Sequence, residues 1–282
     1  MNGDYRYVIC DVFTETPLAG NPLAVFRDAG GIPEARLQLI AREINYSETV
    51  FAYPPQAGGD ARIRIFTPGR ELPFAGHPVL GSAIVLAGAD RDEIRLETGR
   101  GVIPVRLTRR TGRPAFGWMT QPVPSVTPFD AADALVAAVG IGRSELPVEA
   151  YDNGVRHVYV GLESEEAVAR LTPDLGQLAR EFADYGINCF AGAGARWKTR
   201  MFTPGHGVAE DPATGSAAGP LAVHLVRHGR LASGEEIVIS QGAEVRRPSS
   251  LHARVAANAG GIERVEVGGS AVVVGRGELL LD

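Results

Sequence analysis

The feature that most constrains the fold of this 282-residue chain is a stretch that occurs twice. Residues 64–83 read RIFTPGRELPFAGHPVLGSA, and residues 200–217 read RMFTPGHGVAEDPATGSA. Both stretches open with Arg-x-Phe-Thr-Pro-Gly and close with Gly-Ser-Ala. A repeat separated by about half of the chain is typical of a duplicated domain rather than of a solenoid. We therefore predict two halves that share one topology.

Each copy predicts a strand end, a Pro-Gly turn and then an apolar helix. When the copies are aligned from their closing Gly-Ser-Ala, His77 falls opposite Asp211 and Pro78 opposite Pro212. Proline is well suited to the first turn of a helix, where its missing N–H leaves no hydrogen bond unmade. The alignment therefore predicts helices that begin at Pro78 and Pro212, with His77 and Asp211 as their N-cap residues.

Helix N-termini offer free backbone N–H groups and a positive dipole end, which suit a carboxylate or phosphate ligand. Asp211 has a purely structural alternative, because aspartate is a preferred N-cap residue, whereas histidine is not. Different polar residues at matching positions indicate a symmetric scaffold with an asymmetric site. We expect that site at the interface of the two halves, a usual place for ligand pockets.

The remaining pattern predicts an α+β fold in which each half is a curved, barrel-like antiparallel sheet around a central helix. The first domain is predicted to span residues 1–120 and to be joined by a C-terminal strand at 271–282. The second domain is predicted at 131–270, and the proline-rich residues 121–130 are the expected linker. The glycines within residues 265–274 predict a hairpin.

Composition excludes several classes of function. A net charge of −5 gives no reason to expect nucleic acid or acidic membrane as a partner. No apolar run approaches the roughly 20 residues of a membrane span, and the N-terminus does not read as a signal peptide. Cys10 and Cys189 read as reduced core residues. We therefore predict a cytoplasmic protein.

Three other residue patterns are weak evidence for a metal, hydrolase or nucleotide-binding site. His224 and His228 lie one helical turn apart, but no HExxH pattern and no third ligand nearby in the sequence support them, so they predict a polar helix end and no metal site. Ser216, His77 and Asp211 lack the GxSxG elbow of a hydrolase triad. Phosphate-loop and dinucleotide fingerprints are absent from the sequence.

Five blocks that occur in a fixed order carry a family resemblance: Asp11–Phe13, Gly20–Val25, Ser47–Phe51, Glu71–Pro78 and Glu210–Ala217. Together they resemble the PhzF-like family of phenazine-biosynthesis isomerases, and the resemblance covers nearly the whole chain. That family is similar in fold to diaminopimelate epimerase and proline racemase, whose two similar halves each wrap a sheet around a central helix. The resemblance therefore implies the same α+β architecture as the internal repeat.

The resemblance also implies roles for individual residues. Glu48 takes the position of the general acid/base, while His77, Asp211 and Ser216 hold and polarise the substrate. Backbone N–H groups at four positions are implied to meet the substrate carboxylate: Gly76, His77, Gly215 and Ser216. The epimerases use one cysteine from each half, and here the matching positions hold His77 and Asp211, which argues against a two-thiol epimerase.

These implications lead to a hypothesis of cofactor-independent isomerisation of a small carboxylate-bearing substrate. Glu48 removes a proton from an activated carbon and returns it elsewhere on the same face. We expect Tyr46, Phe51 and Phe74 to desolvate Glu48 and to raise its basicity. The alternatives are an amino-acid epimerase or racemase, whose second base would be Asp211 or His77, and a non-catalytic protein that binds small acids.

Two further points follow from the resemblance. Relatives suggest a homodimer, and the family's range of substrates leaves this chain's substrate and pathway open. Where many members read Gly-Arg-Pro-Ser, this chain has Arg246-Arg247-Pro248-Ser249, so we expect that the glycine turn is lost.

Overall fold

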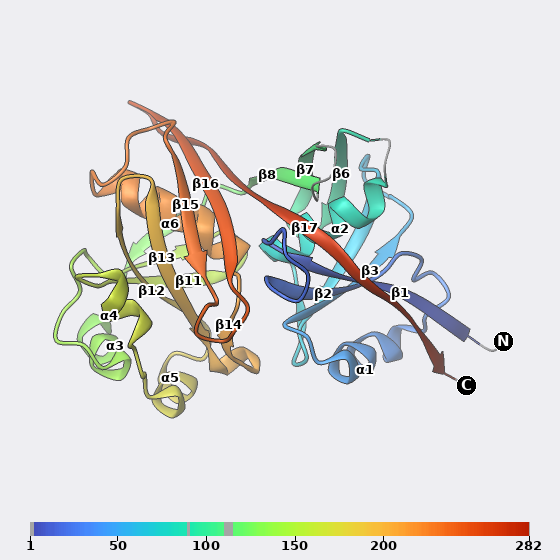
Figure 1. Ribbon diagram of the computed structural model, residues 1–282, viewed down its shortest axis with the longest axis horizontal. Coiled ribbons are helices and arrows are strands. Elements are labelled where there is room, and N and C mark those ends of the chain that lie inside the picture. Colours follow the sequence, from blue (N-terminus) through green and yellow to red (C-terminus); the bar gives the residue numbers. More distant parts are fainter. Residues whose placement is uncertain (1–2, 89–90, 110–114, 282) are drawn as a thin grey trace. The chain divides into compact units, whose positions relative to one another are not determined.

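A computed structural model describes residues 3–88, 91–109 and 115–281 (Figure 1). The chain divides into two compact units. Unit 1 comprises Met1–Thr120 and Gly268–Asp282, and unit 2 comprises Gln121–Val267. The long strand β17 (Gly261–Leu281) contributes its first residues to unit 2 and the remainder to unit 1.

Unit 1 is built on a closed barrel, because β17 pairs with both β1 and β8. The order around the barrel is β17-β1-β2-β3-β4-β6-β7-β8, with β2–β3 and β4–β6 parallel and β1–β2, β3–β4, β6–β7 and β7–β8 antiparallel. The other strands of unit 1 are β1 (Gly3–Val12), β2 (Asn21–Phe26), β3 (Glu48–Tyr53), β4 (Ala61–Phe66), β5 (Glu71–Leu72), β6 (Glu93–Thr98), β7 (Gly101–Thr108) and β8 (Ala115–Gln121).

Helix α2 (Gly76–Ala87) is the central helix of unit 1 and contacts β1, β2, β3, β6 and β7. Nearly all of its residues are buried, which explains an apolar composition without a polar face. Close packing requires Gly81, since a Cβ there would lie 2.7 Å from the side chains of both Leu23 and Val12. Helix α1 (Glu34–Ile44) packs on β3 and β4 over a cluster that includes Phe26 and Phe51.

Unit 2 repeats this pairing pattern: β11–β12 and β13–β15 are parallel, and β9–β10, β10–β11, β12–β13 and β15–β16 are antiparallel. Its other strands are β9 (Ser125–Pro128), β10 (Glu149–Asp152), β11 (Arg156–Gly161), β12 (Gly186–Ala193), β13 (Arg196–Thr203), β14 (Val208–Asp211), β15 (Glu236–Gln241) and β16 (Ser249–Asn258). Its helices are α3 (Ala132–Val139), α4 (Glu165–Ala169), α5 (Leu175–Glu181), α6 (Gly215–Arg227) and a 3₁₀ turn at Pro204–His206.

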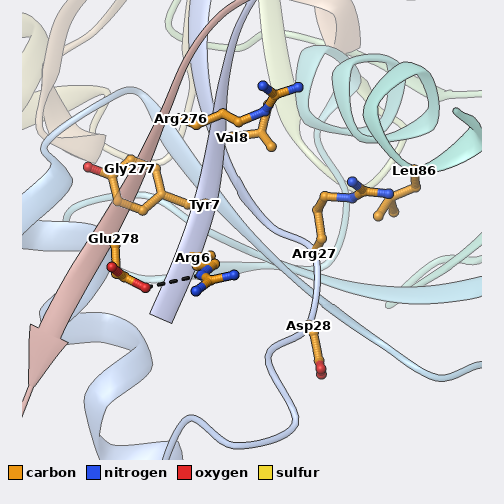
Figure 2. A pocket seen from close by; sticks show the side chains of 9 residues that line it. All are labelled: Arg6, Tyr7, Val8, Arg27, Asp28, Leu86, Arg276, Gly277 and Glu278. Atoms are coloured by element: carbon orange, nitrogen blue, oxygen red, sulfur yellow. Dashed lines mark hydrogen bonds and ion pairs between the residues drawn. The ribbon is translucent and has the colours of Figure 1, made fainter. Parts of the chain in front are cut away.

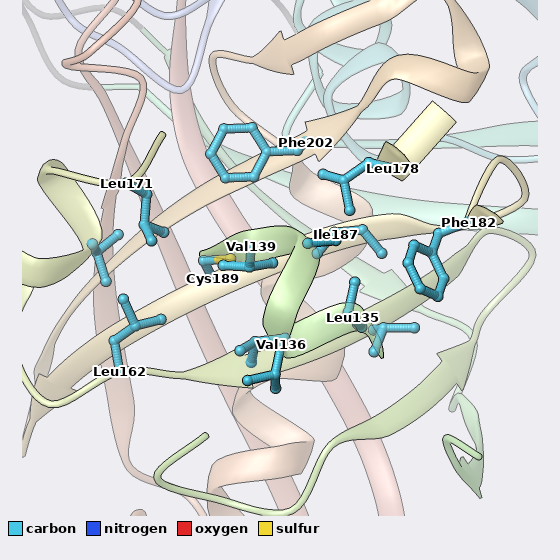
Figure 3. Close-up of a cluster of buried hydrophobic side chains, with 14 of the residues drawn as sticks. Leu135, Val136, Val139, Leu162, Leu171, Leu178, Phe182, Ile187, Cys189 and Phe202 are labelled. Carbon is cyan, nitrogen blue, oxygen red and sulfur yellow. The ribbon is translucent and has the colours of Figure 1, made fainter. Parts of the chain in front are cut away.

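Two cores form in unit 2. Helix α6 contacts β16 and β11 and is the counterpart of α2. On the other side of the sheet, α3 packs Leu135 and Val139 against Ile187 and Cys189 of β12 (Figure 3). Cys189 is buried and unbridged, as is Cys10 in unit 1, which confirms both cysteines as reduced core residues.

The strand pairing corrects the alignment of the two repeated stretches. Phe66 pairs with Glu71, and Phe202 pairs with Glu210. In both copies the first helical residue then follows the glutamate by five positions, at Gly76 and Gly215. The sequence ELPFAGH therefore matches EDPATGS, so that His77 corresponds to Ser216 and Asp211 to Leu72. The closing Gly-Ser-Ala match was fortuitous, because the loop after the strand is longer in the second copy.

The predicted N-cap roles of His77 and Asp211 are consequently wrong. The N-cap residues are Ala75 and Thr214. His77 is the second residue inside α2, and Asp211 ends β14 before the helix begins. Pro212 also precedes its helix, so it acts as a turn residue.

An ion pair that occurs in both copies explains the Arg that opens each of them. Arg64 binds Glu71 through two hydrogen bonds of 2.7 Å. Arg200 binds Glu210 in the same way, at 2.9 and 2.7 Å. Each pair joins a strand to the short strand that precedes the central helix, so the repeated arginine fixes the entry to that helix.

One further expectation was wrong. Residues 261–281 form one strand rather than a hairpin. Gly268 and Gly269 there allow close packing, because a Cβ would lie 2.8 Å from the Trp118 ring and 2.4 Å from the Phe13 ring, respectively. The predicted linker at 121–130 contains β9, which pairs with β10.

The turn at Arg246 is kept without glycine, against expectation. Arg246 has φ 58°, in the left-handed region that favours glycine. Backbone hydrogen bonds from Arg246 to Ala243 and from Arg247 to Gly242 close the turn, at 3.0 and 2.9 Å. The substitution therefore stores strain in the backbone rather than abolishing the turn.

Candidate functional site

In unit 1, the structure brings Glu48 and His77 together. Glu48 is the first residue of β3, and His77 lies in the first turn of α2. Glu48 Oε2 is 3.4 Å from His77 Nε2, and the two side chains are 14% and 3% exposed. A carboxylate thus faces an imidazole in a largely dehydrated setting, as acid/base chemistry requires.

Asn21, the first residue of β2, orients the imidazole. Its amide nitrogen lies 3.2 Å from His77 Nδ1, and an amide N–H that donates to Nδ1 leaves the ring proton on Nε2. Burial lowers the pKa of His77 to about 3, so the ring is neutral near pH 7. His77 therefore presents an N–H donor to Glu48 and no positive charge.

The start of α2 offers backbone N–H donors. Its N-cap residue is Ala75, whose side chain makes no capping hydrogen bond. The first-turn N–H groups of any helix have no partner within the helix. Gly76 and His77, the first two residues of α2, provide two such groups, and Gly76 has no side chain to block an approach.

The expected desolvation of Glu48 by Phe51 is wrong. Successive side chains of a strand point to opposite faces, so Glu48 and Phe51, three positions apart on β3, face opposite ways. The Phe51 ring stacks on Phe26 at 5.0 Å and meets Phe66 at 5.4 Å, within the cluster below α1. Phe51 thus supports the outer helix of unit 1.

In unit 2, a hydrogen-bonded group surrounds the start of α6. Asp211 Oδ2 accepts a hydrogen bond of 2.7 Å from the Thr214 hydroxyl. Gln241 of β15 accepts from the Thr214 N–H at 3.1 Å and donates to the Asp211 carbonyl at 2.8 Å. Asp211 is only 5% exposed. These contacts fix the Asp211 carboxylate next to the helix start without making it the cap.

Ser216 meets a histidine that the sequence analysis did not single out. His157 Nε2 lies 3.1 Å from Ser216 Oγ, and Asn188 Nδ2 lies 3.3 Å from His157 Nδ1. Asn188 donates its amide also to the Gly186 carbonyl, so His157 accepts at Nδ1 and donates from Nε2. Burial lowers the pKa of His157 to about 3. Ser216 Oγ therefore faces an N–H donor and not a basic nitrogen. This arrangement argues against a nucleophilic serine, which needs an adjacent base.

Side chains also compensate an irregularity of α6. Pro220 lies inside the helix and cannot donate to the Ser216 carbonyl. The Asn153 side chain donates to that carbonyl instead, at 2.9 Å, and Gln121 donates to the Gly215 carbonyl at 2.8 Å. The first turn of α6 is thereby held rigidly in place.

The strand pairing shows which residue of unit 2 corresponds to Glu48. Thr49 pairs with Phe66 and Ile187 pairs with Phe202, so Glu48 corresponds to Gly186. A Cβ at Gly186 would lie 2.7 Å from His157 Nδ1. The duplicated scaffold therefore carries a carboxylate at this strand start in unit 1 and no side chain at all in unit 2.

A separate groove of about 890 Å³ lies on unit 1 (Figure 2). Three arginines and two acidic residues contribute to it, and Arg6 pairs there with Glu278 at 3.1 Å. None of the predicted site residues lines this groove. Within residues 3–88, 91–109 and 115–281, no helix is both long and apolar enough to cross a membrane.

The cysteines do not offer thiolates to a two-thiol mechanism. Burial raises the pKa of Cys189 to about 12, and burial raises the pKa of Cys10 still further above its usual range. A reactive cysteine needs the opposite shift, toward a lower pKa.

Comparison with known proteins places the chain. Residues 10–277 match the family described as "Phenazine biosynthesis-like protein". A trans-2,3-dihydro-3-hydroxyanthranilate isomerase from Pseudomonas fluorescens is 51% identical over 278 residues, which cover 98% of this chain and 100% of that protein. The solved structure titled as a predicted epimerase from Pseudomonas aeruginosa is 33% identical, with a TM-score of 0.84 over 99% of this chain and 100% of that one.

A more distant likeness concerns the fold alone. A probable proline racemase from Agrobacterium radiobacter superposes with a TM-score of 0.66 at 14% identity, over 98% of this chain and 93% of that one. The prediction of a two-part α+β fold of the racemase and epimerase type is thereby confirmed.

The chain belongs to the PhzF-like, or phenazine biosynthesis-like, family. Within that family it is an enzyme of the isomerase class that acts on a small molecule.

Sequence reasoning missed the residues that orient the polar groups. Asn21 lies in one of the family blocks, Gly20–Val25, which was the only signal available for it. His157 and Gln241 had no local signal, because they lie 59 and 27 residues from their partners Ser216 and Thr214.

Proposed function

We propose that this isomerase moves a proton within a small carboxylate-bearing substrate, without a cofactor, and that Glu48 is its single acid/base. The observation that carries the proposal is the Glu48–His77 pair in unit 1, together with Gly186 at the corresponding position of unit 2. A duplicated scaffold that carries a carboxylate at this strand start in unit 1 and a glycine at the matching strand start in unit 2 fits a reaction in which Glu48 is the base.

The proposed steps conserve the proton. The Glu48 carboxylate removes a proton from a ring carbon, and the electron pair of the broken C–H bond delocalises into the neighbouring double bonds. The glutamic acid then returns the same proton to another carbon of that conjugated system, on the same face. Neutral His77, whose Nε2 lies 3.4 Å from Glu48 Oε2, adds no positive charge that would lower the basicity of the carboxylate.

The proposed substrate is trans-2,3-dihydro-3-hydroxyanthranilate or a close analogue. Its support is the relative from Pseudomonas fluorescens, which bears that name at 51% identity over its full length. A dihydroanthranilate has a carboxylate and an amino group on a ring with conjugated double bonds, so a ring carbanion is delocalised without an added electron sink. This chemistry supports a cofactor-independent reaction.

The decisive variant is Glu48→Gln, which keeps the shape and removes the base. We expect kcat to fall by about 10²–10⁴-fold, while calorimetric affinity for the product stays within a few-fold of the parent. Glu93→Gln is the matched control, because Glu93 also begins a strand but is exposed. Turnover by Glu48→Gln at the rate of the control would rule out Glu48 as the proton carrier.

A second experiment separates one base from two. Substrate deuterated at the reacting carbon is converted in ordinary water, and the product is analysed by NMR. A single base returns part of the deuterium to the new position, whereas a two-base epimerase takes its second proton from a different group. Complete loss of label, with solvent hydrogen on the opposite face, would favour the epimerase alternative.

The substrate-binding roles of Gly76, His77, Asp211, Gly215 and Ser216 stay predictions. Asp211→Asn and Ser216→Ala test them, since loss of a substrate contact raises KM or lowers kcat at unchanged stability. The homodimer and the cytoplasmic location also stay predictions, and light scattering tests the former.

A further inference from the structure

A group of three metal-ligating side chains lies in unit 2, at the C-terminal end of α6. His224 and His228 are one turn apart on that helix, and Glu149 begins β10. One ligand atom from each lies within 4.8 Å of the others. We propose that Glu149, His224 and His228 form a binding site for one divalent transition-metal ion, of which Zn²⁺ is the prime candidate.

The distances suit an ion of that kind. Glu149 Oε2 lies 2.9 Å from His228 Nε2 and 3.3 Å from His224 Nδ1. A tetrahedral Zn²⁺ with bonds of roughly 2.0–2.1 Å separates its ligand atoms by roughly 3.3 Å. The ion therefore needs small side-chain adjustments and a shift of two ring protons. His228 moves its proton from Nε2 to Nδ1, and His224 moves the proton that Nδ1 donates to the Tyr151 oxygen to Nε2.

The side-chain types also suit an ion, because imidazole nitrogens and carboxylate oxygens are usual ligands of Zn²⁺ in proteins.

Neighbouring groups orient the ligands, as outer partners do in metal sites. The Tyr151 hydroxyl donates to Glu149 Oε2 at 2.8 Å and lies 3.0 Å from His224 Nδ1. Arg227 pairs with the other carboxylate oxygen, Oε1, at 3.3 Å. Oε2 is thereby directed toward both histidines.

The burial of the cluster indicates an entry path. The His224 side chain is fully buried, whereas those of Glu149 and His228 are 13% and 20% exposed. An ion reaches the site from the side of His228, and water fills its fourth position from there. Because eight residues of helix separate His224 from Ser216, the ion lies about 12 Å from the start of α6. Its role is to tie the end of α6 to β10, independently of the proposed proton transfer.

The test uses the full-length chain without a histidine tag, after treatment with a chelator. Titration with Zn²⁺ against a chromophoric chelator should show one equivalent bound per chain, and excess Zn²⁺ should raise Tm by several degrees. Co²⁺ should give the visible absorption of a tetrahedral nitrogen and oxygen site. Glu149→Gln and His228→Gln should each weaken Zn²⁺ binding about tenfold or more.

The matched control is His252→Gln. His252 also pairs with a carboxylate, at 2.7 Å from Glu236, but without a second histidine. This variant should bind Zn²⁺ as the parent does. The proposal is overturned if the parent binds much less than one equivalent, or if Glu149→Gln and His228→Gln bind Zn²⁺ as tightly as His252→Gln. Circular dichroism confirms folding of each variant without metal.

Discussion

His157 should make unit 2 sensitive to acid, because its imidazole is buried and neutral. An unfolded histidine has a pKa near 6.5, whereas burial lowers the pKa of folded His157 to about 3. Below pH ~6.5 the unfolded chain therefore binds a proton that the folded chain does not. The contribution of His157 to stability is complete above that pH and is lost as the pH falls toward 3.

The size of the loss follows from these two values. At about pH 5 an unfolded histidine is almost fully protonated, whereas folded His157 is almost fully neutral. The unfolded pKa of about 6.5 lies about 1.5 units above this pH, so protonation stabilises the unfolded chain by about 2 kcal/mol. In His157→Gln the titrating group is gone. The stability that unit 2 loses between about pH 7.5 and pH 5 should therefore be smaller by about 2 kcal/mol in this variant.

Urea unfolding followed by tryptophan fluorescence measures this difference. In a Trp118→Phe background, Trp197 of unit 2 is the remaining tryptophan. Val158→Ala is the matched control, because Val158 is a buried neighbour on β11 that does not titrate. Val158→Ala should lower the stability of unit 2 by a similar amount, relative to the parent, at both pH values. Equal acid losses in the parent and in His157→Gln would refute the reasoning.

Two other substitutions test structural conclusions. Gly186→Ala places a Cβ about 2.7 Å from His157 Nδ1, so it should lower the stability of unit 2 by about 1–3 kcal/mol in urea. An unchanged urea midpoint would show that this strand start tolerates a side chain. The left-handed conformation of Arg246 costs about 1–2 kcal/mol of stability, and Arg246→Gly removes this cost. The glycine in turn loses more backbone entropy on folding, which costs about 0.5–1 kcal/mol. It should therefore raise the urea midpoint slightly, whereas Arg246→Ile should lower it.

Local signals in the sequence were sufficient for several elements. Aspartate is a preferred N-cap residue, and the Asp174 side chain caps α5 by accepting from the Gln177 N–H at 2.8 Å. Proline is common at helix starts, and Pro33 directly precedes α1. Caps and turns depend on residues a few positions apart, so the sequence carries them directly.

Local signals gave incomplete predictions where contacts with distant residues determine the environment of a side chain. The Gly268–Gly269 pair is typical of a turn, but it lies inside β17, where rings of Trp118 and Phe13 take the space of the missing side chains. His224 and His228 read as a polar helix end, yet His224 is fully buried beside Glu149, 75 residues earlier in the chain. The sequence cannot show which distant strand will cover a helix.

The sequence by itself determined the duplication, the α+β fold and the family, because repeated motifs and periodic apolar residues are properties of neighbouring positions. Tertiary structure alone decided the register of the two copies, the Asn21–His77–Glu48 contacts and the replacement of Glu48 by Gly186 in unit 2. These contacts join residues that are far apart in the chain, and they exist only once the strands have paired. The pairing of β3 with β4 and of β12 with β13 therefore showed that the two halves differ where the chemistry is proposed.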